Sequence, residues 1–463
     1  QRIRRTSADT VASASASNRL VVLDALRGLA ALGILWRNIF VFGMPTVAFA
    51  LPEEWGETVV ANVASWLFVV IFVDGTMRGL FSLIFGATAI LLMERHARAP
   101  GGLLAADLYF RRLMWLIVFG IVHGYLLLWP VPIDPVAWDP PAAPPLHGGP
   151  HAPNERLAAV ERLVEGLGEG PEDIALGPDG MLYTGLADGR IVRFVPRDDA
   201  TVETFANTGG RPLGMEFDAA GHLVVADGRR GLLRFAPDGT KSVLVDTYGG
   251  APLRFADDVD IARDGTIWFS EASRLFEVDE TRLTALDARP TGRLFSYDPK
   301  TAQTTLRLNE LRYANGVSVA PDGSHVLVTE TFGYRVRRLW LEGPDAGKDD
   351  FLAENLPGFP DNVRHDERGI VWVALVSTRS PALDALLPHP WVRSMTLRLP
   401  DFVQPKEPPP FGWVIGLNAA GEVVHDMQDP TGRFGSITSV NAYGPWLYLG
   451  SLHEHAVGRI PRP

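Results

Sequence analysis

ANGVSVAPDGSHVLVTE, residues 314–330, contains the pattern from which the fold can be predicted. Asn315 stands before a short alternating run, and a Pro-Asp-Gly turn follows with Gly323 eight residues after Asn315. A second run rich in β-branched residues then covers 325–329. Alternation of this kind predicts strands, and Asp-Gly between two such runs predicts a hairpin.

The same pattern recurs from about residue 157 to the end of the chain. The other copies are PEDIALGPDGMLYTG (171–185), RPLGMEFDAAGHLVVAD (211–227), ADDVDIARDGTIWFSE (256–271), PDNVRHDERGIVWVAL (360–375) and a looser SITSVNAYGPWLYLGS (436–451). Their turn glycines fall at 180, 221, 265, 323, 369 and 444. Repeats of about 40–50 residues with several strands each are typical of β-propellers, with one blade per repeat. We therefore expect a mainly β fold, a six-bladed β-propeller over residues 157–463.

The first 130 residues have a different character. Residues 1–18 are a polar, basic lead that we expect to be disordered, and four largely apolar segments follow at 20–42, 58–73, 79–93 and 109–129. A membrane helix needs ~20 apolar residues, with a range down to ~17. The sequence thus predicts an N-terminal α-helical membrane segment of three or four helices in residues 19–130. Buried helices of a soluble core are the alternative. Asp24, Arg27 and Arg37 interrupt the first segment, which argues against a signal peptide.

Between the two parts lies a Pro-rich stretch, PVPIDPVAWDPPAAPPLHGGPHAPNE. Proline at this density favours an extended spacer, so residues 131–156 are expected to be a linker. Basic residues cluster in the lead and in the loop at 94–112, and the positive-inside rule favours both on the cytoplasmic side. With three spans, everything after residue 129 would lie outside the cytoplasm.

Composition limits the function classes. The chain of 463 residues has a net charge of −11, and the first 130 residues carry 11 Arg against 8 Asp and Glu. The propeller is therefore acidic, which argues against nucleic-acid binding and is compatible with a bound cation. Because the chain has no cysteine, disulfides, zinc–thiolate sites and Cys nucleophiles are excluded.

The spacing of the repeats points to one site. Counting back eight residues from the first five turn glycines gives Glu172, Leu213, Asp257, Asn315 and Asp361. The next residues are Asp173, Gly214, Asp258, Gly316 and Asn362. Repeats superpose about the propeller axis, so these oxygen-bearing side chains should converge on the central channel, as ligands of a hard cation. Calcium takes 6–8 oxygens, magnesium prefers fewer protein ligands, and softer metals would need His or Cys. The alternative is that Asp, Asn and Gly here are ordinary turn residues.

Two resemblances to known families follow from these motifs. PEDIALGPDG, ADDVDIARDGTIWFSEAS, YANGVSVAPDG and PDNVRHDERGIVWVAL resemble the six-bladed calcium propellers: strictosidine synthase-like proteins, senescence-marker-protein gluconolactonases and paraoxonases. The resemblance covers about residues 130–463 and implies metal roles for Glu172, Asp257, Asn315, Asp361 and Asn362. LDALRGLAALGILWRNIFVFGMP and the two later apolar phrases resemble the start of the YeiB-type bacterial inner-membrane proteins, over about 18–130. This second resemblance implies a bacterial inner-membrane location, and the placement of the basic residues then puts the propeller on the periplasmic side.

The chain departs from these families at two places. Strictosidine synthases carry a catalytic Glu at the start of the last blade, where residues 432–440 read GRFGSITSV, so that activity is not expected. Paraoxonases carry a His where this chain has Leu213. We expect a membrane-tethered calcium-dependent lactonase or arylesterase with Asp361 as nucleophile or as base on a calcium-bound water. The alternative is a propeller that binds a ligand or partner without turnover, with a structural calcium.

The sequence also predicts residues on the substrate side of the site. Leu213, Asp258, Glu271 and His365 are the predicted substrate contacts. Residues 376–411 lengthen the fifth repeat and are either a lid over the pocket, a segment packed on the propeller, or a segment that dips into the bilayer.

Overall fold

The computed structural model describes residues 102–197, 199–400 and 409–463. The chain divides into two compact units, Gln1–Gly124 and Tyr125–Pro463. Helix α5 (Gly102–Leu128) covers most of the fourth apolar segment. None of the helices in the described ranges combines the length and the apolarity needed to cross a membrane. The prediction of membrane helices is thus not supported there, and the three earlier apolar segments lie outside the described residues.

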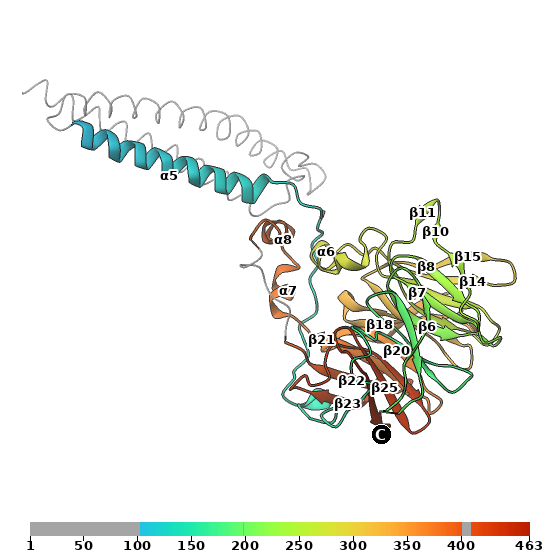
Figure 1. Cartoon of the computed structure of the whole chain (residues 1–463). Helices are drawn as coiled ribbons and strands as arrows, with labels where there is room; N and C mark the ends of the chain where they lie inside the picture. Colours follow the sequence, from blue (N-terminus) through green and yellow to red (C-terminus); the bar gives the residue numbers. More distant parts are fainter. Residues whose placement is uncertain (1–101, 198, 401–408) are drawn as a thin grey trace, which may run out of the picture. The chain divides into compact units, whose positions relative to one another are not determined.

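In the second unit, the described residues form six antiparallel four-stranded sheets, the blades of a propeller (Figure 1). Blade 1 contains β2 (Ile174–Leu176), β3 (Leu182–Gly185), β4 (Arg190–Phe194) and β5 (Glu203–Asn207). Blade 2 contains β6 (Pro212–Phe217), β7 (Leu223–Asp227), β8 (Gly231–Phe235) and β9 (Lys241–Val245). Blade 3 contains β12 (Ala256–Ile261), β13 (Ile267–Glu271), β14 (Gly292–Asp298) and β15 (Gln303–Leu311).

The second half of the propeller repeats this order. Blade 4 contains β16 (Ala314–Val319), β17 (His325–Glu330), β18 (Arg335–Trp340) and β19 (Asp349–Ala353). Blade 5 contains β20 (Gly358–His365), β21 (Val371–Thr378), β22 (Gly412–Leu417) and β23 (Val423–Asp429). Blade 6 contains β24 (Ile437–Tyr443), β25 (Trp446–Ser451) and β26 (Val457–Pro461), with β1 (Glu161–Leu163) as its outermost strand. The six-bladed propeller predicted from the repeats is confirmed.

Strand β1 closes the ring. It precedes blade 1 in sequence but pairs with β26 of blade 6, with Glu161 opposite Arg459 and Leu163 opposite Val457. The first and last blades are thereby joined by backbone hydrogen bonds. Such closure leaves no free sheet edge between the first and last repeats.

The hydrophobic pattern explains the packing. Strands β7, β13 and β17 are buried along nearly their whole length because both faces of each sheet pack against a neighbouring blade. One core cluster, for example, joins Trp268 and Leu294 of blade 3 to Val317 and Val328 of blade 4. The six predicted turn glycines all have positive φ, from +59° at Gly444 to +90° at Gly265. This left-handed conformation suits glycine. Each inner hairpin turn follows the end of an innermost strand, so it lies at the end of the channel opposite the starts of these strands.

Short helices are inserted between the strands. They are η3 (Gly149–His151), η4 (Val278–Glu280), α6 (Thr281–Asp287), η5 (Thr331–Gly333), α7 (Pro381–Leu386) and α8 (Pro390–Thr396), and a small hairpin, β10 (Thr247–Tyr248) with β11 (Ala251–Pro252), extends blade 2. Helices α6, α7 and α8 lie together on one side of the propeller (Figure 1). We call these three helices the cap.

The Pro-rich stretch is extended as predicted, but it is not a free spacer. Residues 131–148, which we call the strap, run along the cap. The backbone amide of Val136 donates to the carbonyl of Asp287 in α6 at 3.1 Å, and that of Trp138 donates to the carbonyl of Leu387 after α7 at 3.1 Å. Apolar contacts between Ile133 and Leu286 reinforce this packing.

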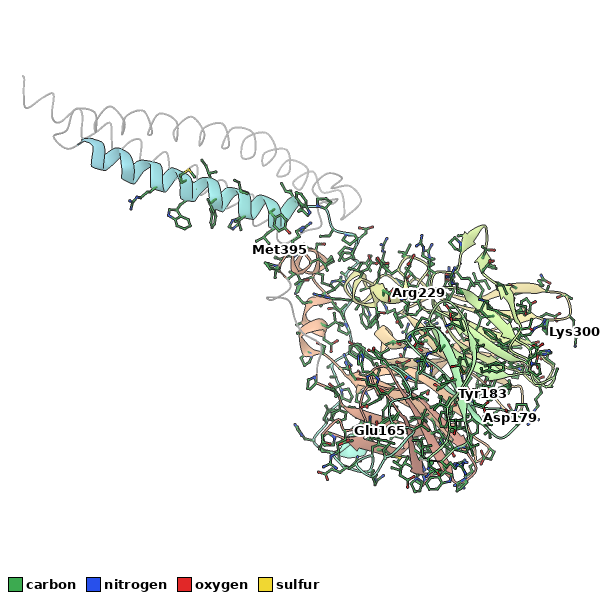
Figure 2. The ribbon with its side chains drawn as sticks, in the orientation of Figure 1. Glu165, Asp179, Tyr183, Arg229, Lys300 and Met395 are labelled. Carbon is green, nitrogen blue, oxygen red and sulfur yellow. The ribbon has the colours of Figure 1, made fainter. Side chains whose placement is uncertain are left out.

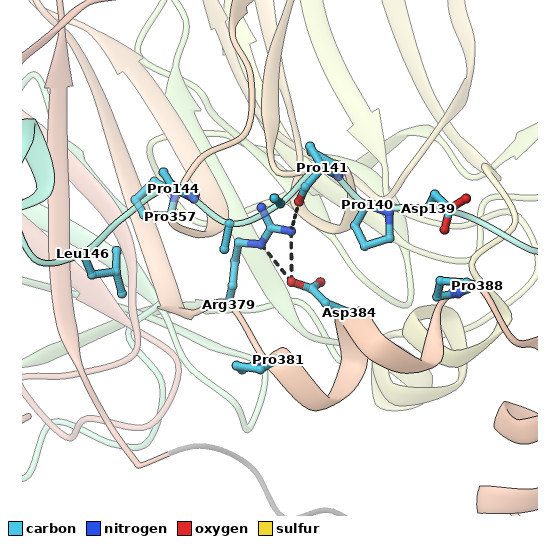
Figure 3. A pocket seen from close by; sticks show the side chains of 12 residues that line it. Asp139, Pro140, Pro141, Pro144, Leu146, Pro357, Arg379, Pro381, Asp384 and Pro388 are labelled. Carbon is cyan, nitrogen blue, oxygen red and sulfur yellow. Dashed lines mark hydrogen bonds and ion pairs between the residues drawn. The ribbon is translucent and has the colours of Figure 1, made fainter.

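One buried ion pair ties the strap, the cap and the propeller together (Figure 3). Arg379 pairs with Asp384 of α7 at 2.9 Å and donates to the strap carbonyl of Pro141 at 2.7 Å. Asp384 also accepts a hydrogen bond of 2.8 Å from the Tyr334 hydroxyl of blade 4, and the Arg379 guanidinium lies 3.9 Å from the centre of the Tyr334 ring. A groove of about 400 Å³ lies beside this pair, walled mainly by prolines.

Replacing Arg379 by Met should loosen the cap. The change leaves Asp384, which is 17% exposed, without its cation, and breaking a buried pair in this way costs roughly 3 kcal/mol. Hydrogen exchange measured by mass spectrometry should therefore show faster exchange in the strap and α7 and unchanged exchange in the blades. Arg190→Met, which breaks the exposed Arg190–Asp188 pair, is the matched control and should change little. Equal exchange in the wild type and Arg379→Met would refute this role for the pair.

Candidate functional site

The candidate ligands of blades 3 to 5 lie in β-bulges of the innermost strands, and Glu172 of blade 1 lies just before β2. In blade 3, Ala256 pairs with Glu271 and Val259 with Phe269, so Asp257 and Asp258 form an irregularity between two regular pairs. The same shift occurs between Ala314 and Val317 in blade 4, and blades 2, 5 and 6 repeat it. A bulge bends its strand and redirects side chains. The innermost strands contact one another around the channel, so the bulges form a ring at the end that carries the starts of these strands.

Five predicted ligands are buried in this ring with unsatisfied oxygens. Their exposed fractions run from 1% for Asn362 to 6% for Asp361. The buried side-chain oxygens without a hydrogen-bond partner are Glu172 Oε2, Asp257 Oδ2, Asn315 Oδ1, Asp361 Oδ1 and Asn362 Oδ1. Buried polar atoms normally have partners, and leaving one unpaired costs about 1–3 kcal/mol. Five such oxygens in one ring indicate a site shaped for a group that supplies positive charge.

The electrostatics agree with this arrangement. Burial raises the pKa of Glu172 well above its usual range, and Asp361 and Asp257 raise it further. Burial followed by Asp361 likewise raises the pKa of Asp257 well above normal. For Asp361, burial raises the pKa to about 8, even though a hydrogen bond from the Asn315 amide opposes the shift. The three carboxyl groups are thus close enough to disfavour one another's ionisation.

Hydroxyl groups of the neighbouring blades fix the backbone of two candidate ligands. Thr329 Oγ1 of blade 4 donates to the Asp361 carbonyl at 2.6 Å. Thr438 Oγ1 of blade 6 donates to the Glu172 carbonyl, also at 2.6 Å. Both hydroxyls are fully buried. The carboxylates are therefore held at defined positions by contacts across blade boundaries.

The residues that follow the ring residues of blades 1 and 3, Asp173 and Asp258, take part in a different structure deeper in the channel. The buried Arg364 guanidinium binds Asp258 through two hydrogen bonds of 2.8 Å each and reaches Asp173 at 3.2 Å. Burial raises the pKa of Asp258 to about 6, although Arg364 opposes the shift. Asp258 also accepts from the Val317 amide at 2.7 Å. Asp258 is thus engaged in a buried ion pair, and both of its carboxylate oxygens have partners.

Of the other predicted substrate contacts, Leu213 lies beside the ring and Glu271 lies inside blade 3. Leu213 is buried in a small apolar cluster with Phe255 and Tyr313, beside the ring. Glu271 is fully buried, where it accepts from Arg293 Nε at 2.6 Å and from the Arg254 amide at 3.1 Å. Both oxygens of Glu271 are thus used inside blade 3, which leaves this residue a structural role.

His365 is also remote from the ring. It ends β20, four residues after Asp361, which corresponds to ~13 Å along a strand. Its Nδ1 lies 2.9 Å from Ser318 Oγ, and burial lowers its pKa to about 4. The structure therefore brings Leu213 to the site but not Asp258, Glu271 or His365.

Sequence reasoning missed the contribution of blade 6. Its bulge contains Thr438 and Ser439, because Ile437 pairs with Ser451 and Val440 with Leu449. Gly444 stands six residues after Thr438, whereas Gly265 stands eight residues after Asp257, so counting back eight residues from Gly444 reaches Ser436 instead. Ser439 Oγ is buried and also lacks a partner. Aligning the copies by their β-branched runs instead of their turn glycines would have found this pair.

The unsatisfied oxygens of the ring fit a hard cation, and they include amide oxygens as well as carboxylate oxygens. In the described part of the chain, no group of three or more His, Asp or Glu side chains is arranged to hold a metal ion. The unsatisfied amide oxygens of Asn315 and Asn362 add two neutral donors to three carboxylates. Carboxylate and amide oxygens are the ligands that calcium uses.

Comparison with known proteins places the chain in a family. Residues 149–194 match the model of the strictosidine synthase-like N-terminal family, and residues 257–344 match that of strictosidine synthase. Protein STRICTOSIDINE SYNTHASE-LIKE 7 of Arabidopsis thaliana is 32% identical over 335 residues, covering 71% of this chain and 88% of that protein. The adipocyte plasma membrane-associated protein of Homo sapiens is 33% identical over 363 residues, covering 73% and 86%.

The chain belongs to the strictosidine synthase-like family. The two family matches include Glu172, Asp257 and Asn315 of the ring. A gluconolactonase from Xanthomonas campestris resembles this strictosidine synthase-like chain in structure with a TM-score of 0.49 and 18% identity, over 66% of this chain and 91% of that one. A calcium-binding regucalcin from Agrobacterium tumefaciens gives a TM-score of 0.45 and 14% identity, over 65% and 93%. Likeness at this distance does not identify an activity.

The ring predicts an unusual pH dependence of stability. Without a divalent cation, folding raises the pKa of Asp361 from 3.8 to about 8, and the pKa values of Glu172 and Asp257 move in the same direction. The stability that these protonated groups contribute is complete below pH ~4 and is lost as the pH rises through ~8. In chelator, the thermal midpoint should therefore fall between about pH 5 and 8.5.

Added calcium should remove most of this fall, because a bound cation stabilises the ionised carboxylates. Differential scanning fluorimetry over this pH range, with and without calcium, measures both effects. Asp361→Asn should show a shallower pH dependence in chelator, whereas Asp264→Asn, at the exposed blade 3 turn, should behave like the wild type. A midpoint in chelator that does not change with pH would contradict the electrostatic description of the ring.

Proposed function

We propose that the propeller is a calcium-dependent hydrolase that acts on lactones or aryl esters. The observation that carries this proposal is the ring of buried, unsatisfied oxygens on blades 1, 3, 4 and 5. Glu172, Asp257, Asn315, Asp361 and Asn362 would hold the ion. A bound calcium ion would polarise a substrate carbonyl and favour negative charge on its oxygen.

Asp361 is the proposed reactive group. The Asn315 amide donates to its carboxylate and Thr329 fixes its carbonyl, so its side chain is oriented from two sides. As a base, Asp361 would take a proton from a water molecule while the water oxygen bonds to the carbonyl carbon. The ester C–O bond then breaks, and the proton passes to the departing alkoxide. As a nucleophile, Asp361 would instead form an acyl intermediate that water hydrolyses.

The apolar cluster beside the ring would receive the body of the substrate. Leu213, Phe255 and Tyr313 are buried, with the Phe255 and Tyr313 rings 5.5 Å apart. A wall of this kind excludes water and strengthens electrostatic interactions at the carbonyl. It offers more to an aryl or alkyl group than to a polyhydroxylated ring.

A second candidate function is ligand binding without turnover, with calcium in a structural role. Two observations favour it. Blade 2 presents Leu213 at the ring, and blade 6 presents the hydroxyls of Thr438 and Ser439. Neither blade therefore supplies a second acid or base beside Asp361.

Hydrolysis of phenyl acetate and of δ-lactones, with and without chelator, separates the two functions. The hydrolase should lose activity in chelator and regain it with calcium. Asp361→Asn should lower kcat roughly 10²–10⁴-fold, the usual effect of removing a general base. Asp264→Asn should keep wild-type rates. If no turnover is sensitive to chelator and Asp361→Asn changes nothing, the binding function replaces the hydrolase.

We also propose, from the sequence alone, that residues 19–130 attach the protein to a bacterial inner membrane with the propeller outside the cytoplasm. The basic lead and the apolar segments support this proposal. Membrane fractionation, followed by protease treatment of spheroplasts, tests both the attachment and the side. Recovery of the full chain in the soluble fraction would refute it.

A further inference from the structure

Arg211 is a buried cation that the proposed chemistry leaves unassigned. It lies in blade 2, two residues before Leu213, and is 7% exposed. Its backbone amide donates to Asp227 Oδ1 at 3.1 Å, and its carbonyl accepts from the Gly228 amide at 2.8 Å. The start of the Arg211 side chain is therefore fixed.

Its guanidinium is seated against blade 1. Nη1 donates to the Gly170 carbonyl at 3.1 Å. A Cβ on Gly170 would lie 2.8 Å from Nη2 and 2.8 Å from the Leu452 carbonyl oxygen, so glycine suits this close approach. Gly170 and Arg211 each stand two residues before the ring position of their blade, where adjacent blades meet. The guanidinium is thus placed at the ring by a close approach of two blades.

The Arg211 guanidinium has no carboxylate partner. In the described chain its side chain makes one hydrogen bond, to the Gly170 carbonyl, and no ion pair. It nevertheless acts electrostatically on both Glu172 and Asp257 of the ring. A guanidinium carries five N–H donors, and a buried cation without a partner is costly. Arg364, by contrast, donates hydrogen bonds to Asp258, Asp173 and backbone carbonyls.

The next blades place aromatic rings at the equivalent position. Phe255, Tyr313 and Phe359 each stand two residues before the ring residue of blades 3, 4 and 5. Phe332 links two of them, with its ring 4.8 Å from Tyr313 and 5.9 Å from Phe359. The end of the channel therefore has a cation on blade 2 and an arc of aromatic rings on blades 3 to 5.

We propose that Arg211 binds the carboxylate of an amphipathic substrate whose apolar body lies against Phe255 and Tyr313. A guanidinium fork matches a carboxylate in geometry and charge. The three acidic residues of the ring disfavour a dianion such as a phosphate monoester, so a monoanionic carboxylate is the better fit. This inference rests on the proposed function for the reaction, but the binding it describes does not require turnover.

Binding of benzoate and benzamide tests the inference, because these probes share a ring and differ in charge. Calorimetric titration of the calcium-loaded full chain should give tighter binding of benzoate than of benzamide. Arg211→Met should weaken benzoate at least about tenfold, the equivalent of about 1.4 kcal/mol, and leave benzamide unchanged. Arg211→Lys, which keeps the charge but loses the fork, should fall between.

Arg229→Met is the matched control. Arg229 belongs to the same blade and is exposed (Figure 2), and it pairs with Asp279 at 2.7 Å. Benzoate affinity in this variant should equal that of the wild type. An equal loss in Arg229→Met and Arg211→Met would show a general charge effect and overturn the assignment, as would benzoate affinity that survives in a folded Arg211→Met.

Turnover separates this inference from the hydrolase proposal. With 4-carboxyphenyl acetate and phenyl acetate as substrates, Arg211→Met should raise KM for the acid alone. If neither ester is hydrolysed but the benzoate difference depends on Arg211, the binding assignment stands and the hydrolase proposal fails. If both are hydrolysed and Arg211→Met affects them equally, the hydrolase proposal stands and the role of Arg211 fails.

Discussion

Crowding at the propeller axis is the constraint on which the other features depend. Six innermost strands share one channel, and two of the register positions there must be glycine. A Cβ on Gly214 would lie 2.1 Å from Asp258 Oδ1, and one on Gly316 would lie 2.4 Å from the Val363 amide nitrogen. Asp258 fits only because blade 2 has a glycine, Gly214, at the position that faces it. The polar groups at the axis therefore depend on the missing Cβ atoms of Gly214 and Gly316 as well as on their hydrogen bonds.

The buried carboxylates of two adjacent layers in this channel differ in whether a cation of the protein is bonded to them. In the deeper layer, Arg364 is a built-in cation, and Asp258, Asp173 and Asp260 raise its pKa well above normal despite burial. In the ring layer, Glu172 and Asp257 have no cation bonded to them, and their pKa values rise well above normal, whereas the pKa of Asp258 beside Arg364 rises only to about 6. The contrast within one channel supports a diffusible cation for the ring.

The sequence predicts the parts of this arrangement that repeat. The turn glycines, the blade number and the buried positions of Glu172, Asp257, Asn315 and Asp361 follow from one eight-residue spacing. Features that depend on contacts between repeats do not. The engagement of Glu271 with Arg293 becomes visible only once the strands are paired, and the blade 6 bulge depends on one shorter turn. The strap is extended as its prolines dictate, but its sequence gives no sign that it packs on the cap.

The cap packs against the apolar wall beside the ring. Tyr313 forms part of the apolar wall, and its hydroxyl lies 3.4 Å from Thr281 Oγ1 at the start of α6. The space between Tyr313 and the cap is about 10 Å³, roughly enough for one water molecule. The proposed aryl ester is far larger, so it would reach Tyr313 from this side only if α6 and α7 moved. The cap is held by Arg379 and Asp384, outside the channel, so the stability of that ion pair would contribute to the free energy of such a movement.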